Sequence, residues 1–257
     1  MERARIDLAG VHERLTESAV NAATREENLL ASGEQVARAV GNLSDVRSGG
    51  PNCDMALSDA LIGVQFFLNI SRIDADGRVV CSALPAAKGT DEAQRAIFQQ
   101  ARHARSFVVS GQIYSSVVKG PVISGMLPLR SPTGAFDGVI AITLDTHWLD
   151  DMLKARKLPH GAVVAIFDRT GKVVAASDTQ KAASIFRHAA LSQNAQGKLE
   201  TAQDQSGTNW SYATAALLGD NIFVGFARCY QRLLGPTYLH VSTDGLMPIV
   251  MIALAWV

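Results

Sequence analysis

The sequence predicts an α+β fold in which one long helix precedes two related units, each built on an antiparallel sheet. Three observations lead to this prediction. A stripe of apolar residues runs at seven-residue intervals through residues 2–47, a hairpin of the form apolar strand, D-x-x-G, basic residue, Val-Val occurs twice, and each hairpin is followed by a helix and further strands. The repeated order indicates that one fold unit is duplicated.

Residues 2–47 are predicted to form one amphipathic helix. Its other positions are mostly Glu, Arg, Asn, Ser and Gln, so the apolar stripe is narrow, as in a coiled-coil seam. Such a seam packs either on the chain's own sheets or on a second copy of the chain, and the sequence leaves both open. Ser48-Gly49-Gly50-Pro51 ends the helix. The residues that form the stripe are Leu8, Leu15, Ala22, Leu29, Val36 and Leu43.

The first unit is predicted to begin with a short helix and a β-hairpin. The turn sequence Asp74-Ala75-Asp76-Gly77 separates two strand-like runs, which is typical of a hairpin. Asp91 and Gln94 have the spacing of a capping box, which indicates that a helix begins there. Three strands and a closing helix follow. The expected helices span 54–63, 91–103 and 148–156, and the expected strands 66–73, 78–81, 106–110, 121–128 and 138–144.

The second unit repeats this order on a smaller scale. Asp168 and Gly171 occupy the turn positions that Asp74 and Gly77 occupy in the first hairpin, and Val173-Val174 follows as Val79-Val80 does. Its expected strands are 163–167, 172–174, 210–215 and 221–227, with a helix over 181–194. We expect four segments: a helix over 1–50, a first unit over 51–158, a second unit over 159–235 and a terminal helix over 236–257.

Composition and motifs argue against several classes of function. Lys+Arg and Asp+Glu both number 24, and no basic run exceeds two residues, so a nucleic-acid binder is not expected. No Gly-x-Ser-x-Gly turn, phosphate-binding glycine loop or C-x-x-C pair occurs. Asp74 to Gly77 resembles the start of an EF-hand loop, but its twelfth position is Pro85 instead of an acid. We therefore expect no catalytic residues, no metal site and no cofactor.

The last residues are apolar. The run 245–257, GLMPIVMIALAWV, carries no charge but is shorter than the roughly 20 residues that span a bilayer. We interpret it as the first part of a transmembrane helix; a buried terminal helix or strand is the alternative.

Two stretches carry a resemblance to a known family: Ile73–Ser82, IDADGRVVCS, and 134–142, GAFDGVIAI. With the order of elements, they make nearly the whole chain similar to tandem Cache (double PAS-like) sensor domains. These domains lie outside the membrane in bacterial histidine kinases, diguanylate cyclases and chemoreceptors. The Cys-Ser pair after the first hairpin, with another Cys just after the first helix, most resembles the kinase and cyclase members.

The resemblance implies where the domain lies in the cell and what kind of partner it has. It implies a periplasmic domain held in the bacterial inner membrane by flanking transmembrane helices, with the first unit distal to the membrane. A homodimer and a small-molecule ligand or periplasmic partner protein are expected, and a histidine kinase of a two-component system is the first choice of output. In an oxidising periplasm Cys53 and Cys81 are expected to form a disulfide, which leaves Cys229 over. Two reduced, buried cysteines are the alternative.

The resemblance also bears on the ligand. Amino-acid-binding relatives carry Arg, Trp and Tyr on the distal helix, a later Tyr, and an Asp in the sheet that pairs with the ligand ammonium. Here Arg95 fills the Arg place, Ile97 and Phe98 replace Trp and Tyr, and Thr143 replaces the Asp. An ammonium buried beside Thr143 would be unpaired, so an amino-acid receptor of the usual type is not expected.

The distal unit is the expected ligand-binding unit. Arg95 is a candidate to clamp a carboxylate or phosphate, although an exposed helix Arg is an equal alternative. A docking ectodomain without any small-molecule site is the competing function. The candidate ligand-binding residues are Arg95, Phe98, Phe107, Ser110, Tyr114, Ser124 and Thr143.

Overall fold

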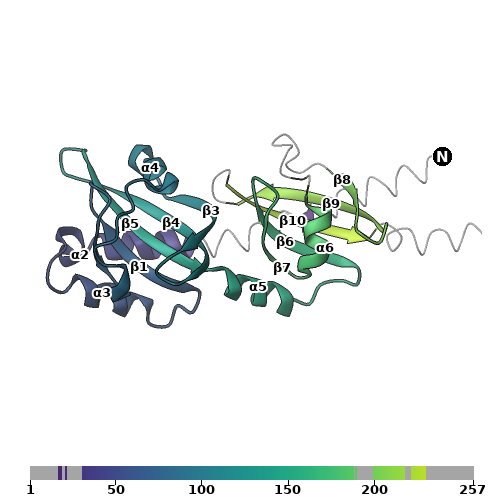
Figure 1. Cartoon of the computed structure of the whole chain (residues 1–257), viewed down its shortest axis with the longest axis horizontal. Helices are drawn as coiled ribbons and strands as arrows, with labels where there is room; N and C mark the ends of the chain where they lie inside the picture. Colours follow the sequence, from purple (N-terminus) through teal and green to yellow (C-terminus); the bar gives the residue numbers. More distant parts are fainter. Residues whose placement is uncertain are drawn as a thin grey trace, which may run out of the picture.

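The structure is a computed structural model that describes residues 17, 18, 21, 31–187, 189, 199–217 and 221–229. Within this part of the chain, two five-stranded antiparallel sheets lie one after the other along the long axis, with helices packed against them (Figure 1). The α+β class and the duplicated sheet unit are therefore confirmed.

The first sheet has the strand order β2-β1-β5-β4-β3, so the hairpin lies at one edge and β3 at the other. The α4 helix packs on one face of this sheet, against β3, β4 and β5. The elements of this unit are α2 (Ser44–Ser48), α3 (Cys53–Leu61), β1 (Phe67–Ile73), β2 (Val79–Ser82), the 3-10 helix η1 (Pro85–Ala87), α4 (Ala96–His103), β3 (Val108–Ser115), β4 (Gly120–Arg130) and β5 (Phe136–Asp145).

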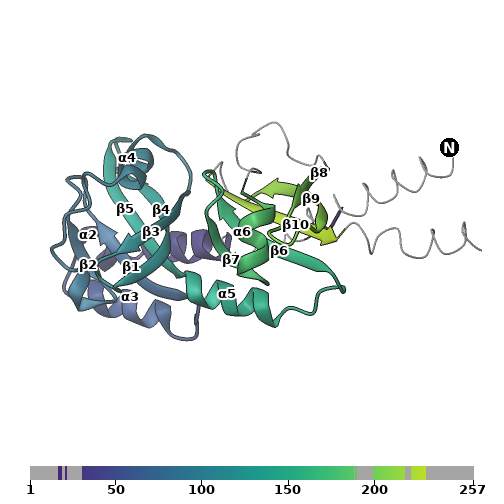
Figure 2. The ribbon, with the colours of Figure 1, turned by 45° about the vertical axis from the view of Figure 1, so that its right-hand side comes forward.

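The second sheet repeats this topology, with the order β7-β6-β10-β9-β8. The α5 helix joins the two units, and α6 covers the outer face of the second sheet (Figure 2). Its elements are α5 (Thr146–Ala155), β6 (Ala162–Asp168), β7 (Val173–Ala176), α6 (Thr179–Ile185), β8 (Glu200–Gln203), β9 (Asn209–Ala216) and β10 (Ile222–Cys229).

Residues 31–41 are helical and pack on the first sheet, on the face opposite α4. Two glycines allow this close approach: a Cβ on Gly33 would lie 3.3 Å from the Phe67 ring, and one on Gly41 would lie 3.2 Å from Ile140. Over these residues the apolar seam is therefore buried against the chain's own sheet. Most residues of the expected helix before position 31 lie outside the described part of the chain.

The prediction of an unbroken helix to residue 47 is wrong. The chain turns after residue 41, Leu43 is extended with ψ at 132°, and the separate helix α2 follows. Gly49, with φ at +67°, ends α2 by donating its backbone N–H to Val46, as expected for a glycine after a helix.

Three apolar clusters stabilise the described fold. The largest is continuous across both units: it joins Ala37 and Val40 of the first helix to Leu149 of α5 and to Ile166 of the second sheet. The other two lie on the outer faces, one between α4 and the first sheet and one between α6 and the second sheet. Each sheet thus buries one face in a shared core and the other under a helix of its own.

Two other sequence predictions about elements are wrong. The helix expected from residue 91 begins at Ala96, and its N-cap is Arg95, because Asp91 instead accepts a hydrogen bond from the Ala93 N–H and pairs with Arg78 in a β-bridge. The second sheet also has a fifth strand, β8, whose short polar sequence carries no strand signal. It makes the two sheets equal in strand number.

The terminal segment 236–257 lies outside the described residues. Among the described helices, none is long and apolar enough to cross a membrane.

Two glycines in the motifs of the resemblance are required by close backbone contacts. Gly77 has φ at +92°, and a Cβ there would lie 2.5 Å from the Cα of Ala93. Gly138 has φ at +93°, and a Cβ there would lie 2.1 Å from the carbonyl oxygen of Ile73. Both positions exclude larger residues, because an L side chain would be strained and would overlap the neighbouring chain.

The predicted disulfide is present. Cys53 at the start of α3 is bonded to Cys81 in β2, with 6.0 Å between their Cα atoms, and both side chains are buried. The bridge therefore ties the helical segment before the first sheet to the edge hairpin.

Replacing both cysteines, Cys53→Ala with Cys81→Ala, is expected to lower the free energy of unfolding by about 3 kcal/mol, because the bridge restricts the unfolded chain. Urea unfolding of the oxidised protein measures this change. Cys229→Ala, which removes the third, half-buried cysteine, is the matched control. Free thiols at positions 53 and 81 in oxidised protein would contradict the prediction.

Candidate functional site

A cavity lies on the α4 face of the first sheet, beside the N-terminal end of α4. Its volume is about 60 Å³. The sheet forms its floor, and the segments around η1 and between β3 and β4 form its walls. Its lining residues are Asn69, Ser71, Ile73, Val79, Ala87, Thr90, Glu92, Arg95, Ile113, Ser115, Val117, Val118, Val122, Ser124, Met126, Ala141 and Thr143.

The floor carries a polar row that crosses three strands. Asn69 of β1 is paired in register with Thr143 of β5, and Thr143 is paired with Ser124 of β4. Paired residues of neighbouring antiparallel strands have their side chains on the same face. The row therefore places hydroxyl and amide groups side by side on the cavity floor.

A closed ring of hydrogen bonds fixes one end of this floor. The Asn69 amide donates to Ser71 Oγ at 2.9 Å, the Ser71 and Ser82 hydroxyls lie 3.0 Å apart, and the Ser82 hydroxyl donates back to Asn69 Oδ1 at 2.9 Å. The Leu84 N–H also donates to Asn69 Oδ1, at 3.0 Å. All three polar side chains of the ring are buried, so the ring provides the partners that burial requires.

The disulfide lies directly behind this ring. Asp54 follows Cys53, and its carboxylate accepts the backbone N–H of Ser82 at 2.9 Å. The second oxygen of Asp54 pairs with Lys88 Nζ at 2.8 Å, and this hydrogen bond, followed by that from Ser82, lowers the pKa of Asp54. The α3 helix is thereby joined to the cavity floor by a covalent and a polar link.

One wall of the cavity carries an ion pair. Arg95 Nε lies 2.5 Å from Glu92 Oε2, and the exposed fractions of the two side chains are 33% and 16%. Burial raises the pKa of Glu92, and the nearby Arg95 opposes that rise. The cavity therefore contains one partly buried carboxylate and one guanidinium, which neutralise each other.

Three of the seven candidate residues line this cavity: Arg95, Ser124 and Thr143. Ser110 lies next to it, where its hydroxyl accepts the Ser124 N–H at 2.9 Å and donates to the Gly111 carbonyl at 2.6 Å. The structure does not bring the other three to the cavity. Phe98 of α4 is fully buried against the sheet, Phe107 packs over Gly125 in the shared core, and Tyr114 is 66% exposed.

Sequence reasoning missed most of the polar lining. Asn69 and Ser71 did have a signal, because they alternate with apolar residues in a strand that is otherwise suited to burial. Glu92 had none, because it lies in an irregular segment that the sequence assigned to a helix. Thr90 and Ser115 lie at the ends of loops and were not distinguishable from ordinary turn residues.

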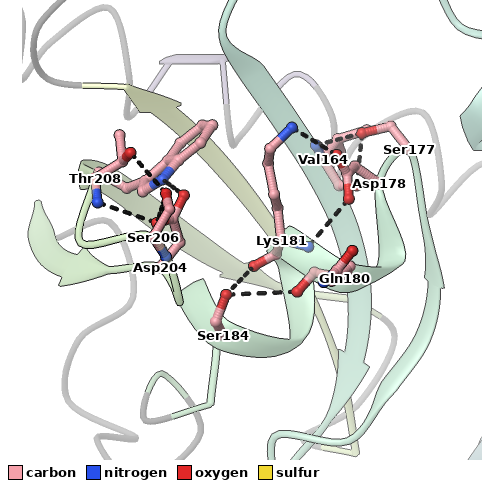
Figure 3. A network of polar contacts seen from close by, with 10 residues as sticks. Val164, Ser177, Asp178, Gln180, Lys181, Ser184, Asp204, Ser206 and Thr208 are labelled. Atoms are coloured by element: carbon pink, nitrogen blue, oxygen red, sulfur yellow. Dashed lines mark hydrogen bonds and ion pairs between the residues drawn. The ribbon is translucent and has the colours of Figure 1, made fainter.

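The second unit has a more open hollow between α6 and the β8–β9 turn (Figure 3). Its polar groups bind one another: Asp178 caps α6 through the Lys181 N–H and pairs with Lys181 Nζ at 2.8 Å. Asp204 accepts the Ser206 and Thr208 N–H groups at 2.9 and 3.0 Å. These bonds close a turn and a helix end, so this hollow is a weaker candidate than the cavity of the first unit.

The fold is shared with known extracellular sensor domains. The extracellular domain of rpHK1S-Z16, a protein assigned as a histidine kinase, superposes with a TM-score of 0.69 over 89% of this chain and 98% of its own, at 17% identity. The ligand-binding domain of the Pseudomonas fluorescens chemoreceptor CtaA, solved with L-serine, gives 0.67 over 86% and 98%, at 15% identity. That of the Campylobacter jejuni chemoreceptor Tlp3, solved with L-norvaline, gives 0.65 over 88% and 93%, at 15% identity.

These likenesses confirm the expected fold, two PAS-like sheets in tandem. No protein-family model matches the sequence, and no curated protein sequence matches it.

Asp204 provides a pH-dependent contribution to stability. Hydrogen bonds, first that from the Ser206 hydroxyl, lower its pKa to about 2, against 3.8 for a free Asp. Because the folded pKa is below the unfolded value, the stabilisation is present above pH 3.8 and is lost as the pH falls towards 2. Asp204→Asn should therefore be less stable by about 1 kcal/mol at pH 7, and the deficit should shrink near pH 3. Urea unfolding at both pH values measures it; a deficit that does not depend on pH would contradict the prediction.

The hydrogen-bond ring is expected to be required for a stable floor. Asn69→Leu keeps the branched shape of the side chain but removes the acceptor Oδ1 from both Ser82 Oγ and the Leu84 N–H, which then retains only its longer hydrogen bond to Ser82 Oγ at 3.2 Å. The expected cost is about 2 kcal/mol. Denaturant unfolding measures the loss, and amide exchange at Leu84 should become faster. Asn209→Leu, on an exposed position of β9, is the control and should change stability by less than about 0.5 kcal/mol. Unchanged exchange at Leu84 would show that the ring does not hold this strand end.

Proposed function

We propose that this chain is the extracytoplasmic sensing module of a bacterial membrane receptor and that it binds a small ligand in the cavity of the first unit. The observation that carries the proposal is the combination of a polar floor and a partly buried ion pair in that cavity, within the fold of extracellular sensor domains. Small-molecule sites typically combine apolar walls with a few convergent polar groups.

The receptor assignment rests on the fold and on the uncharged apolar run of residues 245–257. The chemoreceptor domains that share the fold were solved with L-serine and L-norvaline, which favours a small molecule over a purely structural role. In this proposal the chain is anchored in the inner membrane by helices flanking the periplasmic domain, acts as a homodimer, and controls a histidine kinase, with a diguanylate cyclase or chemoreceptor as the other possible output. The catalysis then belongs to the output region, and this chain contributes sensing.

β3 offers a route for the signal from the cavity to the second unit. Its Ile113 and Ser115 line the cavity, and its Val109 carbonyl accepts a hydrogen bond from the Asn221 side chain of the second unit at 2.7 Å. Gly111, between them, lies against Asp168 at the β6–β7 turn. A ligand that shifts β3 would therefore act directly on the contact between the two units.

Thr143→Leu tests the proposal by filling the cavity floor. In a thermal-shift screen of carboxylates, amines, amino acids, polyols and sugars, a ligand of the cavity should raise the melting temperature of the wild type and not that of the variant. Thr133→Leu, in the exposed β4–β5 turn, is the matched control and should respond as the wild type does.

Two results would contradict the proposal. A hit that stabilises the wild type and Thr143→Leu equally would place its binding outside the cavity. The absence of any hit across the panel would favour a docking ectodomain, in which the partner is a periplasmic protein.

A further inference from the structure

We infer that β3 switches between two registers against β4 and that this switch couples the cavity to the second unit. In the register that the structure shows, β3 carries a bulge. In the other register, the extra residue of the bulge moves into the β3–β4 turn. The inference rests on the proposed function and names how the state of the cavity reaches the second unit. Its test uses the ligand-free protein, so the two can fail separately.

The bulge is a mismatch of two residues against one in the middle of β3. The pairing with β4 shifts by one residue there, so that Ser110 and Gly111 together lie opposite Ser124. The Ser110 hydroxyl accepts the Ser124 N–H at 2.9 Å, and this side chain thereby takes part in the hydrogen bonding of the bulge. The pairs on either side are in regular register. The extra residue is therefore held at one position of the strand by one hydroxyl group.

The turn after β3 is able to take up the extra residue. It now consists of residues 116–119, and moving the bulge into it would extend it to residues 115–119. Turns of four and of five residues are both common in β-hairpins. The present turn places Lys119 at a φ of +54°, in a region that residues with a Cβ rarely adopt. The shorter turn is therefore not free of strain, and its extension is an ordinary change for a hairpin.

The two registers present different side chains to the cavity. Ile113 and Ser115 line it in the observed register. A shift of one residue turns the side chains of a strand to the opposite face, so Gln112 and Tyr114 would replace them. Tyr114 is 66% exposed in the observed register, and its ring would lie in the cavity wall in the other. A ligand would meet two different walls and bind them with different affinity, which is the condition for shifting the two populations.

The second unit docks on the bulge. The Asn221 side chain donates to the Val109 carbonyl at 2.7 Å, immediately before the bulge. A Cβ on Gly111 would lie 3.4 Å from the Cβ of Asp168, so the bulged residue packs against the end of β6. Drawing Gly111 into regular pairing with β4 would remove this packing and move the strand beside Asn221. The docked second unit therefore favours the bulged register.

Cross-linking between opposed cysteines reports the register. In a Cys229→Ala background, Gln112→Cys with Val122→Cys places two thiols directly opposite each other in the second register; we call its product the second-register cross-link. Ile113→Cys with Val122→Cys does so in the observed register, in which these two residues are paired, and gives the observed-register cross-link. Under mild oxidation with diamide both should form, the second-register cross-link to the smaller extent. Peptide mapping measures both yields.

Two substitutions should raise the second-register yield, and one deletion should abolish it. Ser110→Ala removes a hydroxyl that holds the bulge, and Asn221→Ala removes the docking hydrogen bond, so each should raise the yield about threefold, as the loss of one net hydrogen bond allows. Asn209→Ala, on an exposed position of β9, is the control and should leave the yield unchanged. Deletion of Gly111 removes the extra residue, so only the observed-register cross-link should remain.

The outcomes separate this inference from the proposed function. If the observed-register cross-link forms but the second-register cross-link forms in none of the variants, the switch is overturned and sensing in the cavity is unaffected. A second-register cross-link that survives the deletion of Gly111 would arise from fraying of β3 and would overturn the switch as well. The expected yields, together with no hit in the thermal-shift screen, would support the two registers and overturn ligand binding in the cavity.

Discussion

One continuous apolar core determines how the rest of this molecule can be used. It joins helix 31–41, α3, α5 and one face of each sheet, with side chains such as Ile140, Ile142, Val164 and Val224 fully buried. Burial of this much apolar surface is the main favourable term in folding, and it uses the inner face of both sheets. Of the sheet faces in the described part of the chain, the two outer ones, under α4 and α6, remain available to form a site.

The two outer faces differ in how completely they are filled. In the second unit Phe167 stacks on Phe186 with 5.3 Å between ring centroids, and Gly225 leaves the space that the Phe186 ring occupies. In the first unit Phe98 fills the part of the face under α4, but the strands beyond it carry Asn69 and Thr143. Polar side chains cannot close such a space by apolar packing, so a cavity remains there and its groups need partners from one another or from a ligand.

The sequence predicted what depends on periodic patterns and missed what depends on irregular segments. The hairpins, the order of the strands and the duplication follow from alternation and turn residues, and the contact made by Gly77 explains part of the motif behind the family resemblance. The capping-box pattern misled because Asp91 closes a local turn instead of a helix end. That error placed Glu92 inside a helix, and it concealed the only carboxylate among the cavity-lining residues. The sheet position carries Thr143, as the sequence predicted, and the carboxylate that lines the cavity comes instead from Glu92 in the segment before α4.

The way in which the strands around the cavity are held also limits how a movement there could be passed to the second unit. A ligand can shift an equilibrium only by its differential affinity for two arrangements of the protein. The floor is held by the hydrogen-bond ring and by the disulfide behind it, so it resists movement. The opposite edge strand, β3, is held less regularly: its pairing with β4 is interrupted between Val109 and Gln112, beside the contact with Asn221. In the proposed function, a ligand in the cavity would act between this fixed floor and this less regular edge, and the difference in restraint would direct its effect towards the second unit.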